Sequence, residues 1–382
     1  YSPGSLRPET ARALYGAELH FSSSRIDVLA GCHFAHFLQY GLRAQEREPA
    51  EFDSRFYGTF VHDVLEYIVQ QTEREGGFAA VPRSRVQELA QERMEQNAQT
   101  LLETFPDSGR TGYLLRRTFD EVTQVVDELY DELSVSAFRP KFCELEFSAR
   151  GALPGVAFAG ERCRGVVEGF VDRVDVWQSG GRPYVRVVDY KTGKKSFDYT
   201  NVLHGRGLQM LLYLFALVRQ GGHLLHGEPL PAGVLYFPAR IERVSVRDRL
   251  AQAEIEKERR KQLRRSGVLL NSDPVLEAME PCGGSPRFLP YTLDKEGRKT
   301  GDLASFAQLA QLERFVFRTV AALGDELADG RIDPDPCIRD AKDSACAFCP
   351  YSEICAGHEQ PRWLKKITAE EFWQTLERRE HG

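Results

Sequence analysis

Residues 184–193 read YVRVVDYKTG, a β-branched and aromatic run that ends in charged residues and a glycine. This composition predicts a strand. Because side chains two apart on a strand point to the same side, Asp189 and Lys191 are expected on one face. Taken alone, an acidic and a basic residue at the end of a strand are more often a surface ion pair than a functional site.

The preceding stretch changes that interpretation. Residues 165–177, GVVEGFVDRVDVW, predict a second strand, and Gly180 and Gly181 predict the tight turn that joins the two strands. Antiparallel pairing would bring Asp172 close to Asp189. Two neighbouring carboxylates repel each other unless a cation lies between them, and oxygen ligands of this kind suit Mg²⁺ or Mn²⁺.

Two predicted helices carry polar residues that fit around such a cation. His62 and Glu66 lie four apart on one face of an amphipathic helix, and Gln209 and Tyr213 lie four apart in a helix that is otherwise apolar. Each pair has a simpler explanation, a hydrogen-bonded histidine in one case and polar groups that reach a strand edge in the other. The order in which these pairs and the two aspartates follow one another along the chain indicates a functional site more strongly than either pair alone.

The rest of the chain predicts an α/β fold, with a mixed sheet flanked by helices and added helical layers. Further strands are expected at 142–149 and 233–239, and helices in 1–50, 58–138, 206–219 and 303–327, with N-cap candidates at residues 22–24. Five segments follow: an N-terminal helical segment (1–50), a helical part (51–140), a core sheet with its helix (141–239), a basic helix and loop insertion (240–302), and a C-terminal helix with a cysteine tail (303–382).

The tail carries a C-x2-C-x5-C pattern at Cys346, Cys349 and Cys355. Three thiolates so close in sequence indicate a metal centre, which needs a fourth ligand. Cys32 is the best donor and would join the two ends of the chain, but His33, His36 and Cys337 are alternatives. Spacing alone does not distinguish zinc from an iron–sulfur cluster.

Composition excludes a mostly disordered or fibrous chain, with 42% hydrophobic and 28% charged residues in 382. The net charge of −6 argues only weakly against DNA, because residues 240–265 alone carry ten Lys and Arg against five Asp and Glu. Such a helix would either contact phosphates or present a solvated face. No apolar run is long enough for a membrane span, and the first residues, which lack a Met, predict a processed or excised chain without a secretory signal.

Together these motifs resemble the PD-(D/E)XK nucleases, and among them the RecB-type nuclease domain. The resemblance rests on GTFVHDVLE (58–66), GFVDRVD (169–175), VDYKTG (188–193) and QMLLY (209–213). It implies a restriction-endonuclease-like fold in which His62, Asp172, Asp189 and the carbonyl of Tyr190 bind Mg²⁺. It also implies that Lys191 supports the attacking water, that Gln209 and Tyr213 form a supporting motif, and that Glu144, or Glu146 two residues on, assists with Glu66.

The cysteine-bearing ends are similar to AddB-type subunits of bacterial AddAB helicase–nucleases. That resemblance implies a [4Fe-4S] cluster on Cys32, Cys346, Cys349 and Cys355. It also implies a cytoplasmic, Mg²⁺-dependent exonuclease domain that degrades single-stranded DNA in break repair, beside an AddA-type partner. Lys194 and Lys195 are then expected to contact DNA. Alternatives are a free-standing iron–sulfur nuclease, an inactive DNA-binding scaffold, and a zinc-dependent structural adaptor.

Overall fold

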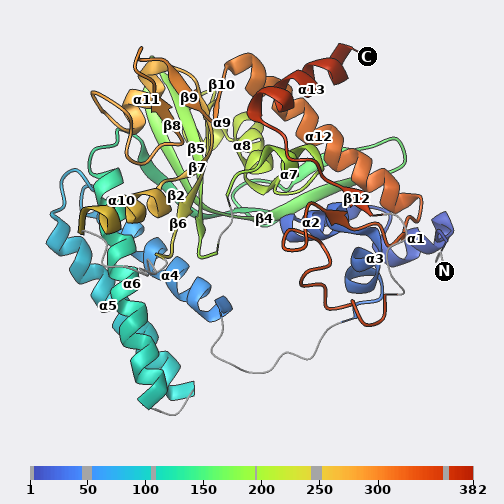
Figure 1. The fold of residues 1–382 in the computed structure, drawn as a ribbon, viewed down its shortest axis with the longest axis horizontal. Coiled ribbons are helices and arrows are strands. Elements are labelled where there is room, and N and C mark those ends of the chain that lie inside the picture. The colour runs from blue at the N-terminus through green and yellow to red at the C-terminus, as the bar shows by residue number, and fades with distance from the viewer. Residues whose placement is uncertain are drawn as a thin grey trace.

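The computed structural model describes residues 4–44, 54–104, 109–193, 196–241, 252–355 and 361–381. Its centre is an eight-stranded mixed sheet (Figure 1) with the strand order β1-β4-β5-β6-β7-β10, in which β2 and β3 also pair with β4. The strands are β1 (Leu19–Ser22), β2 (Arg139–Phe147), β3 (Val156–Ala159), β4 (Arg164–Ser179), β5 (Arg182–Lys191), β6 (Leu230–Pro238), β7 (Ser266–Leu270) and β10 (Leu303–Ala304). The predicted α/β fold with a mixed sheet is confirmed.

Strand β4 organises this sheet. It pairs in parallel with β1 and antiparallel with β2, β3 and β5. The predicted turn after it is confirmed: Gly180 and Gly181 both have positive φ (59° and 75°), as a two-residue hairpin turn requires. Strand β6 then runs parallel to β5, so the carboxyl ends of these two strands meet at Lys191 and Pro238.

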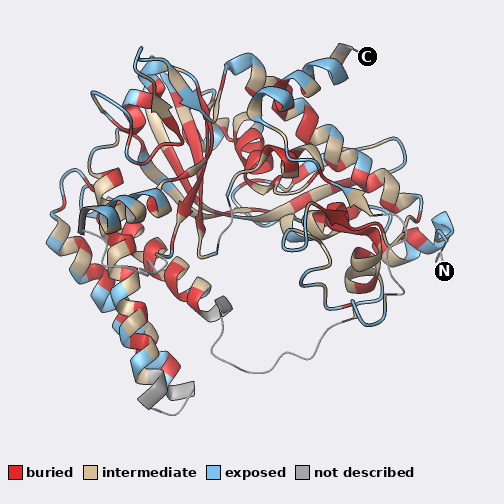
Figure 2. Cartoon of the chain, in the orientation of Figure 1, coloured by how far each residue is buried: buried red, intermediate tan, exposed pale blue. Residues whose placement is uncertain are grey.

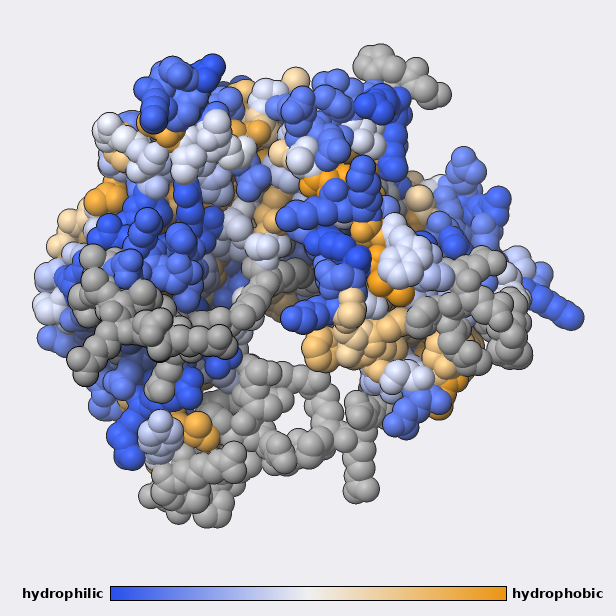
Figure 3. All heavy atoms as spheres, in the orientation of Figure 1, coloured by the Kyte–Doolittle hydropathy of each residue, from blue (hydrophilic) through white to orange (hydrophobic). Residues whose placement is uncertain are grey.

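Helices cover the sheet (Figures 1 and 2), and the predicted apolar helix is confirmed as α8 (Gln209–Gln220), which packs on β5 and β6 and is buried from Met210 to Leu217. The other described helices in the same core are α1 (Pro8–Tyr15), α2 (Ser23–Gly31), α4 (Ser54–Arg74), α5 (Arg83–Thr104), α6 (Gly109–Leu133), α7 (Tyr199–Leu203), α9 (Gly222–Leu225), α11 (Asp273–Met279), α12 (Phe306–Ala328) and α13 (Ala369–His381). None of the described helices is long and apolar enough to cross a membrane. The face in Figure 3 is largely hydrophilic, with apolar side chains in small patches.

Several elements differ from the sequence-based expectation. Helix α12 is not the last one, because α13 follows the cysteine tail. Strands β1 and β3 were not predicted, since four residues are too few for a clear alternation. In the basic stretch only α10 (Gln252–Leu263) is described as helix, residues 242–251 lie outside the described ranges, and β7 follows at once. Ser22 is confirmed as the N-cap of α2, since its hydroxyl accepts the Arg25 N–H.

A segment near the N-terminus, with α2 and α3 (His33–His36), lies beside a segment near the C-terminus, with β12 (Arg362–Trp363), in Figure 1. The backbone N–H of Phe34 donates to the carbonyl of Asp333 at 3.0 Å. The thiol of Cys337 donates to the carbonyl of Ala30 at 3.3 Å. These contacts bring Cys32 near the cysteine tail.

A fully buried group of five charged side chains lies behind β4 and β5. Asp175 accepts hydrogen bonds from the guanidinium groups of Arg173 and Arg186, each at 2.8 Å. Glu132 of α6 pairs with Arg186 at 3.1 Å and with Arg265 at 2.8 Å. With three arginines and two carboxylates, the network has a net charge of +1 and joins α6 to β4, to β5 and to the residue that precedes β7.

We expect Glu132→Gln to lower the free energy of unfolding by about 3–5 kcal/mol, since buried Arg265 loses its paired carboxylate and buried Arg186 loses one of its two. Denaturant unfolding measures this change. Glu228→Gln, which removes a carboxylate that is 90% exposed beside Arg182, is the matched control and should change stability by less than about 0.5 kcal/mol. Equal effects of the two substitutions would contradict this role.

The same group has a pH signature. Burial alone would raise the pKa of Glu132, but Arg265, Arg186 and Arg173 hold it at about 2, below the ordinary value of 4.5. The folded pKa is depressed, so this stabilisation is present above pH 4.5 and is lost as the pH falls toward 2. The free energies of unfolding of the wild type and Glu132→Gln should therefore converge as the pH falls through this range. A difference that stays constant with pH would refute the assignment.

Candidate active site

Three carboxylates come from neighbouring positions on adjacent strands. Arg173 pairs with Cys143 on β2 and with Val188 on β5. Asp172 is the residue before Arg173, and Glu144 and Asp189 are the residues after Cys143 and Val188 on the two antiparallel neighbours. The register therefore places Asp172 between Glu144 and Asp189. The predicted approach of Asp172 and Asp189 through antiparallel pairing is thus explained by the register.

Glu144 has an unusual backbone for a residue inside a strand, with φ = 47°. A left-handed conformation disfavours any side chain but glycine, and such strain is often found at functional sites. Glu144, rather than Glu146, joins His62 and Asp172 in a group whose ligand atoms all lie within 4.8 Å of one another. The carboxylate of Glu146 instead accepts a hydrogen bond from Ser148 at 2.7 Å.

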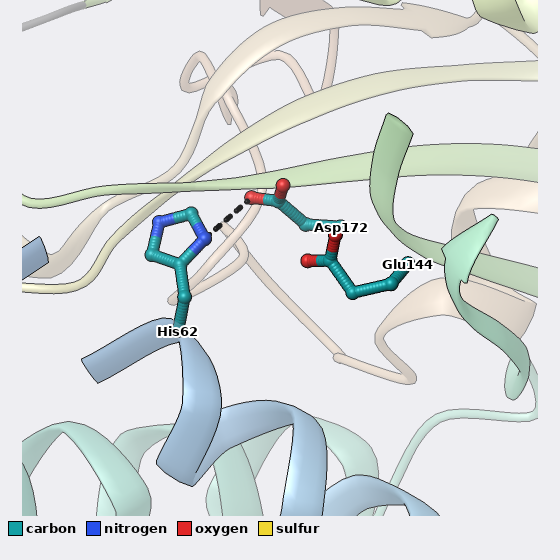
Figure 4. A group of neighbouring side chains, drawn as sticks. All are labelled: His62, Glu144 and Asp172. Carbon is teal, nitrogen blue, oxygen red and sulfur yellow. Dashed lines mark ion pairs between the residues drawn. The ribbon is translucent and has the colours of Figure 1, made fainter. Parts of the chain in front are cut away.

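Helix α4 supplies His62 (Figure 4), because apolar residues of the same helix, such as Val61 and Leu65, are buried in the core. Its Nδ1 atom lies 3.5 Å from Asp172 Oδ2, and its Nε2 atom lies 2.9 Å from the carbonyl oxygen of Tyr190. The backbone N–H of Tyr190 donates to the same Asp172 oxygen at 2.7 Å. The histidine, the aspartate and the backbone after Asp189 are therefore held together.

The electrostatics of the site favour a cation. Burial first, and then the neighbouring Asp189, raise the pKa of Asp172 well above its ordinary value. Burial and Glu66 likewise raise the pKa of Glu144. Burial lowers the pKa of His62, so the imidazole stays neutral and can bind a metal.

The atoms present fit a divalent cation. His62 Nε2 donates a hydrogen bond to the Tyr190 carbonyl oxygen at 2.9 Å, which leaves the lone pair on Nδ1, the nitrogen that lies 3.5 Å from Asp172 Oδ2. Carboxylates from Asp172 and Glu144 would add the hard oxygen ligands that Mg²⁺ and Mn²⁺ prefer.

Asp189 and Lys191 lie beside this group and pair with each other through Asp189 Oδ2 and Lys191 Nζ. Lys191 Nζ also lies 5.7 Å from the centre of the Tyr236 ring. The ammonium group is thus oriented by a carboxylate and an aromatic face, next to the position that a cation would take.

Helix α8 supports the site from below β4. The hydroxyl of Tyr213 donates to the carbonyl of Glu168 at 3.3 Å, and a Cβ on Gly169 would lie 2.1 Å from that hydroxyl. Tyr213 therefore positions the strand that carries Asp172.

The other predicted site residues have these positions. Gln209 begins the same helix as Tyr213. Glu66 accepts a hydrogen bond from Gln70 at 2.8 Å, and Lys194 and Lys195 lie outside the described residues.

All four predicted cluster cysteines line one small, mostly apolar cavity of about 130 Å³: Cys32, Cys346, Cys349 and Cys355. The alternative fourth ligands have other partners. The ring nitrogens of His33 contact Asp335 and Glu326, and the Nε2 atom of His36 accepts a hydrogen bond from Arg25. A tetrahedral zinc ion with Zn–S bonds of ~2.3 Å would hold its sulfurs ~3.8 Å apart. In the described chain, no three of these sulfurs lie within 4.8 Å of one another.

The sequence patterns did not predict that Arg173, Asp175 and Arg186 are buried, although these side chains lie directly behind the candidate active site. Arg173 also donates to the hydroxyl of Tyr190 at 2.9 Å. Their signal was a charged residue at every second position of otherwise apolar strands, which a half-exposed sheet shows equally well.

Comparison with known proteins supports the same interpretation. A model of the PD-(D/E)XK nuclease superfamily matches residues 20–356. The chain is 34% identical over 92% of its length to the B subunit of the ATP-dependent helicase/deoxyribonuclease of Moorella thermoacetica. It is 31% identical over 91% to the protein of that name in Caldanaerobacter subterraneus, and 29% over 96% to that in Thermoanaerobacter.

The chain spans about a third of the length of these relatives, between 30% and 33% of each. The match includes the strands and helices that bring together His62, Asp172 and Asp189. With the sheet, the row of carboxylates and the adjacent lysine in place, the chain belongs to the PD-(D/E)XK nuclease superfamily.

Proposed function

We propose that this chain is a Mg²⁺-dependent deoxyribonuclease domain that degrades single-stranded DNA as an exonuclease, within an AddB-type subunit of a helicase–nuclease. The observation that carries the proposal is the close group of His62, Glu144, Asp172 and the Tyr190 carbonyl beside the Asp189–Lys191 pair. The relatives' names support DNA as the substrate and a helicase–nuclease assembly with an AddA-type partner. Break repair in the bacterial cytoplasm is the setting that such a substrate implies.

The chemistry follows from charge. A divalent cation, when bound, stabilises the negative charge of the scissile phosphate and activates water for attack. Asp172, His62, Asp189 and the Tyr190 carbonyl would hold it. Lys191, oriented by Asp189, adds a second positive group next to the reacting phosphate, an effect worth ~3–4 kcal/mol for one well-placed donor.

We propose that the four cysteines hold a [4Fe-4S] cluster that joins the two ends of the chain. The four cysteines line one cavity, which supports a shared centre, and the resemblance to AddB-type subunits favours a cluster over a single zinc ion. Intact His62, Asp172 and Lys191 argue against an inactive scaffold, and the relatives argue against a free-standing nuclease. A zinc-dependent adaptor would not account for the three neighbouring carboxylates of Glu144, Asp172 and Asp189.

Lys191→Ala and Asp189→Ala should each lower the rate of cleavage at least about 100-fold, because the first removes the cation next to the phosphate and the second removes the carboxylate that orients it. Anaerobic digestion of end-labelled single-stranded DNA with Mg²⁺ measures the rate, and the product ladder gives the direction of digestion. Glu146→Gln, a nearby carboxylate outside the site, is the control and should cut at the wild-type rate. Wild-type cleavage by either Lys191→Ala or Asp189→Ala would contradict the assignment.

Metal binding should depend on pH. Because the pKa of Asp172 is raised, protons compete with the cation near neutrality, and the apparent affinity for Mn²⁺ should increase by up to about tenfold per pH unit. Calorimetric titration in buffers of different ionisation enthalpy should show proton release on binding. A constant affinity from about pH 6 to about pH 8, without proton release, would show that Asp172 is not a ligand.

Cys349→Ser should remove the visible absorbance and the bound iron of the anaerobically purified protein and lower its thermal stability, because one cluster ligand and the link between the chain ends are lost. Cys282→Ser, a cysteine far from the cavity in sequence, is the control and should keep both properties. A colourless wild-type protein with one zinc ion per chain would contradict the proposal of an iron–sulfur cluster.

A further inference from the structure

A second cavity, of about 300 Å³, adjoins the candidate active site on the far side of Lys191. It lies where β5 and β6 end and β7 begins, since Lys191 is level with Pro238 and Tyr236 with Ser266. Helix α10, part of the basic stretch, lies beside β6 in Figure 1 and contributes Gln262. The carboxyl ends of parallel strands commonly carry ligand sites.

The charge of this cavity has one sign. Lys191, Arg240 and Arg264 line it, and none of its described lining residues is acidic. The guanidinium of Arg264 is fixed by two backbone carbonyls: Nε donates to Leu289 at 3.0 Å and Nη2 donates to Tyr291. Neutral carbonyls hold the group without cancelling its charge.

Arg240 is held in a similarly neutral way. It lies 5.0 Å from the centre of the Tyr57 ring, a cation–π contact that keeps the positive charge available. Within the described ranges, neither Arg240 nor Arg264 forms an ion pair.

The larger cavity near the cysteine tail, of about 1020 Å³, has the opposite balance. It is lined by Arg206 and Lys342 but also by four aspartates, Asp27, Asp198, Asp340 and Asp343. A phosphate there would meet a surplus of negative charge. The smaller cavity is therefore the better anion site.

We propose that the cavity between Lys191, Arg240 and Arg264 binds the phosphate group of the nucleotide next to the scissile bond. The inference rests on the proposed nuclease function and gives the path of the substrate strand, from the carboxylate row across Lys191 toward α10. Lys191 belongs to both the active site and the cavity, so successive phosphates would lie on its two sides. Arg240 and Arg264 would act as phosphate-binding residues that set the register of the strand.

The test uses the full chain and a fluorescent oligothymidylate, with binding measured by anisotropy in EDTA at several salt concentrations. Arg240→Gln and Arg264→Gln should each weaken binding about tenfold, the loss of one charge-assisted contact. Each should also reduce the slope of log K against log salt by about 0.7, the value for one phosphate contact on a single strand. Arg182→Gln, at the hairpin end of β5, is the matched control and should change neither.

A second arm places a single uncharged methylphosphonate at each linkage in turn. At one linkage the methylphosphonate should weaken binding to the wild-type protein about tenfold. It should hardly change binding to Arg240→Gln, because the methylphosphonate and the arginine substitution remove the same contact. Because Arg264 also holds two carbonyls, Arg240→Gln decides the test if Arg264→Gln does not fold. An Arg240→Gln protein with the affinity and salt slope of Arg182→Gln would overturn the proposal.

These measurements do not depend on cleavage. A protein that shows the expected binding changes but never cuts DNA with Mg²⁺ would contradict the proposed nuclease activity and leave the phosphate site in place. A protein that cuts DNA but shows no effect of Arg240→Gln on binding would contradict the phosphate site alone.

Discussion

Asp172 and Asp189 lie close together on adjacent strands, although two partly buried carboxylates repel each other. The pairing of β4 with β5 holds them there, and the reverse side of the same strands secures that pairing. Asp175 faces Arg186 directly across the two strands, and their side chains hydrogen-bond at 2.8 Å. A slip of one residue would exchange the two faces, leaving the buried charges unpaired and moving the carboxylates away from His62. The net positive charge of the buried network also lies behind the acidic row, where it opposes the repulsion.

Each remaining part of the site depends on that frame. Helix α4 presents His62 to the carbonyl that follows Asp189, and α8 fixes the backbone of β4 through Tyr213 and Gly169. The carboxyl ends of β5 and β6 place Lys191 between the carboxylates and a cavity of positive charge. The cysteine-lined cavity lies between the two ends of the chain, where the contacts of α2 and α3 with the C-terminal segment already hold them together. A cluster in that cavity would strengthen this connection.

Much of this arrangement could be predicted from the sequence, because β4, β5 and α8 have strong local patterns. The hairpin glycines, the alternation around Asp172 and the apolar helix each specify a conformation without knowledge of distant residues. The buried network could not be predicted, since Glu132 meets Arg265 only after α6 packs on the sheet. The choice of Glu144 over Glu146 depends on one left-handed residue inside β2. Arg240 and Arg264 meet Lys191 only because β6 and β7 are neighbours in the sheet.

Anomalous diffraction from crystals soaked in Mn²⁺ tests the central claim most directly, since it locates the cation without relying on catalysis. The account predicts one strong peak bounded by the imidazole of His62, the carboxylate of Asp172 and the carbonyl oxygen of Tyr190. Absence of a peak there, or a peak only in the larger cavity beside Asp340 and Asp343, would contradict a metal site built on the paired carboxylates of β4 and β5.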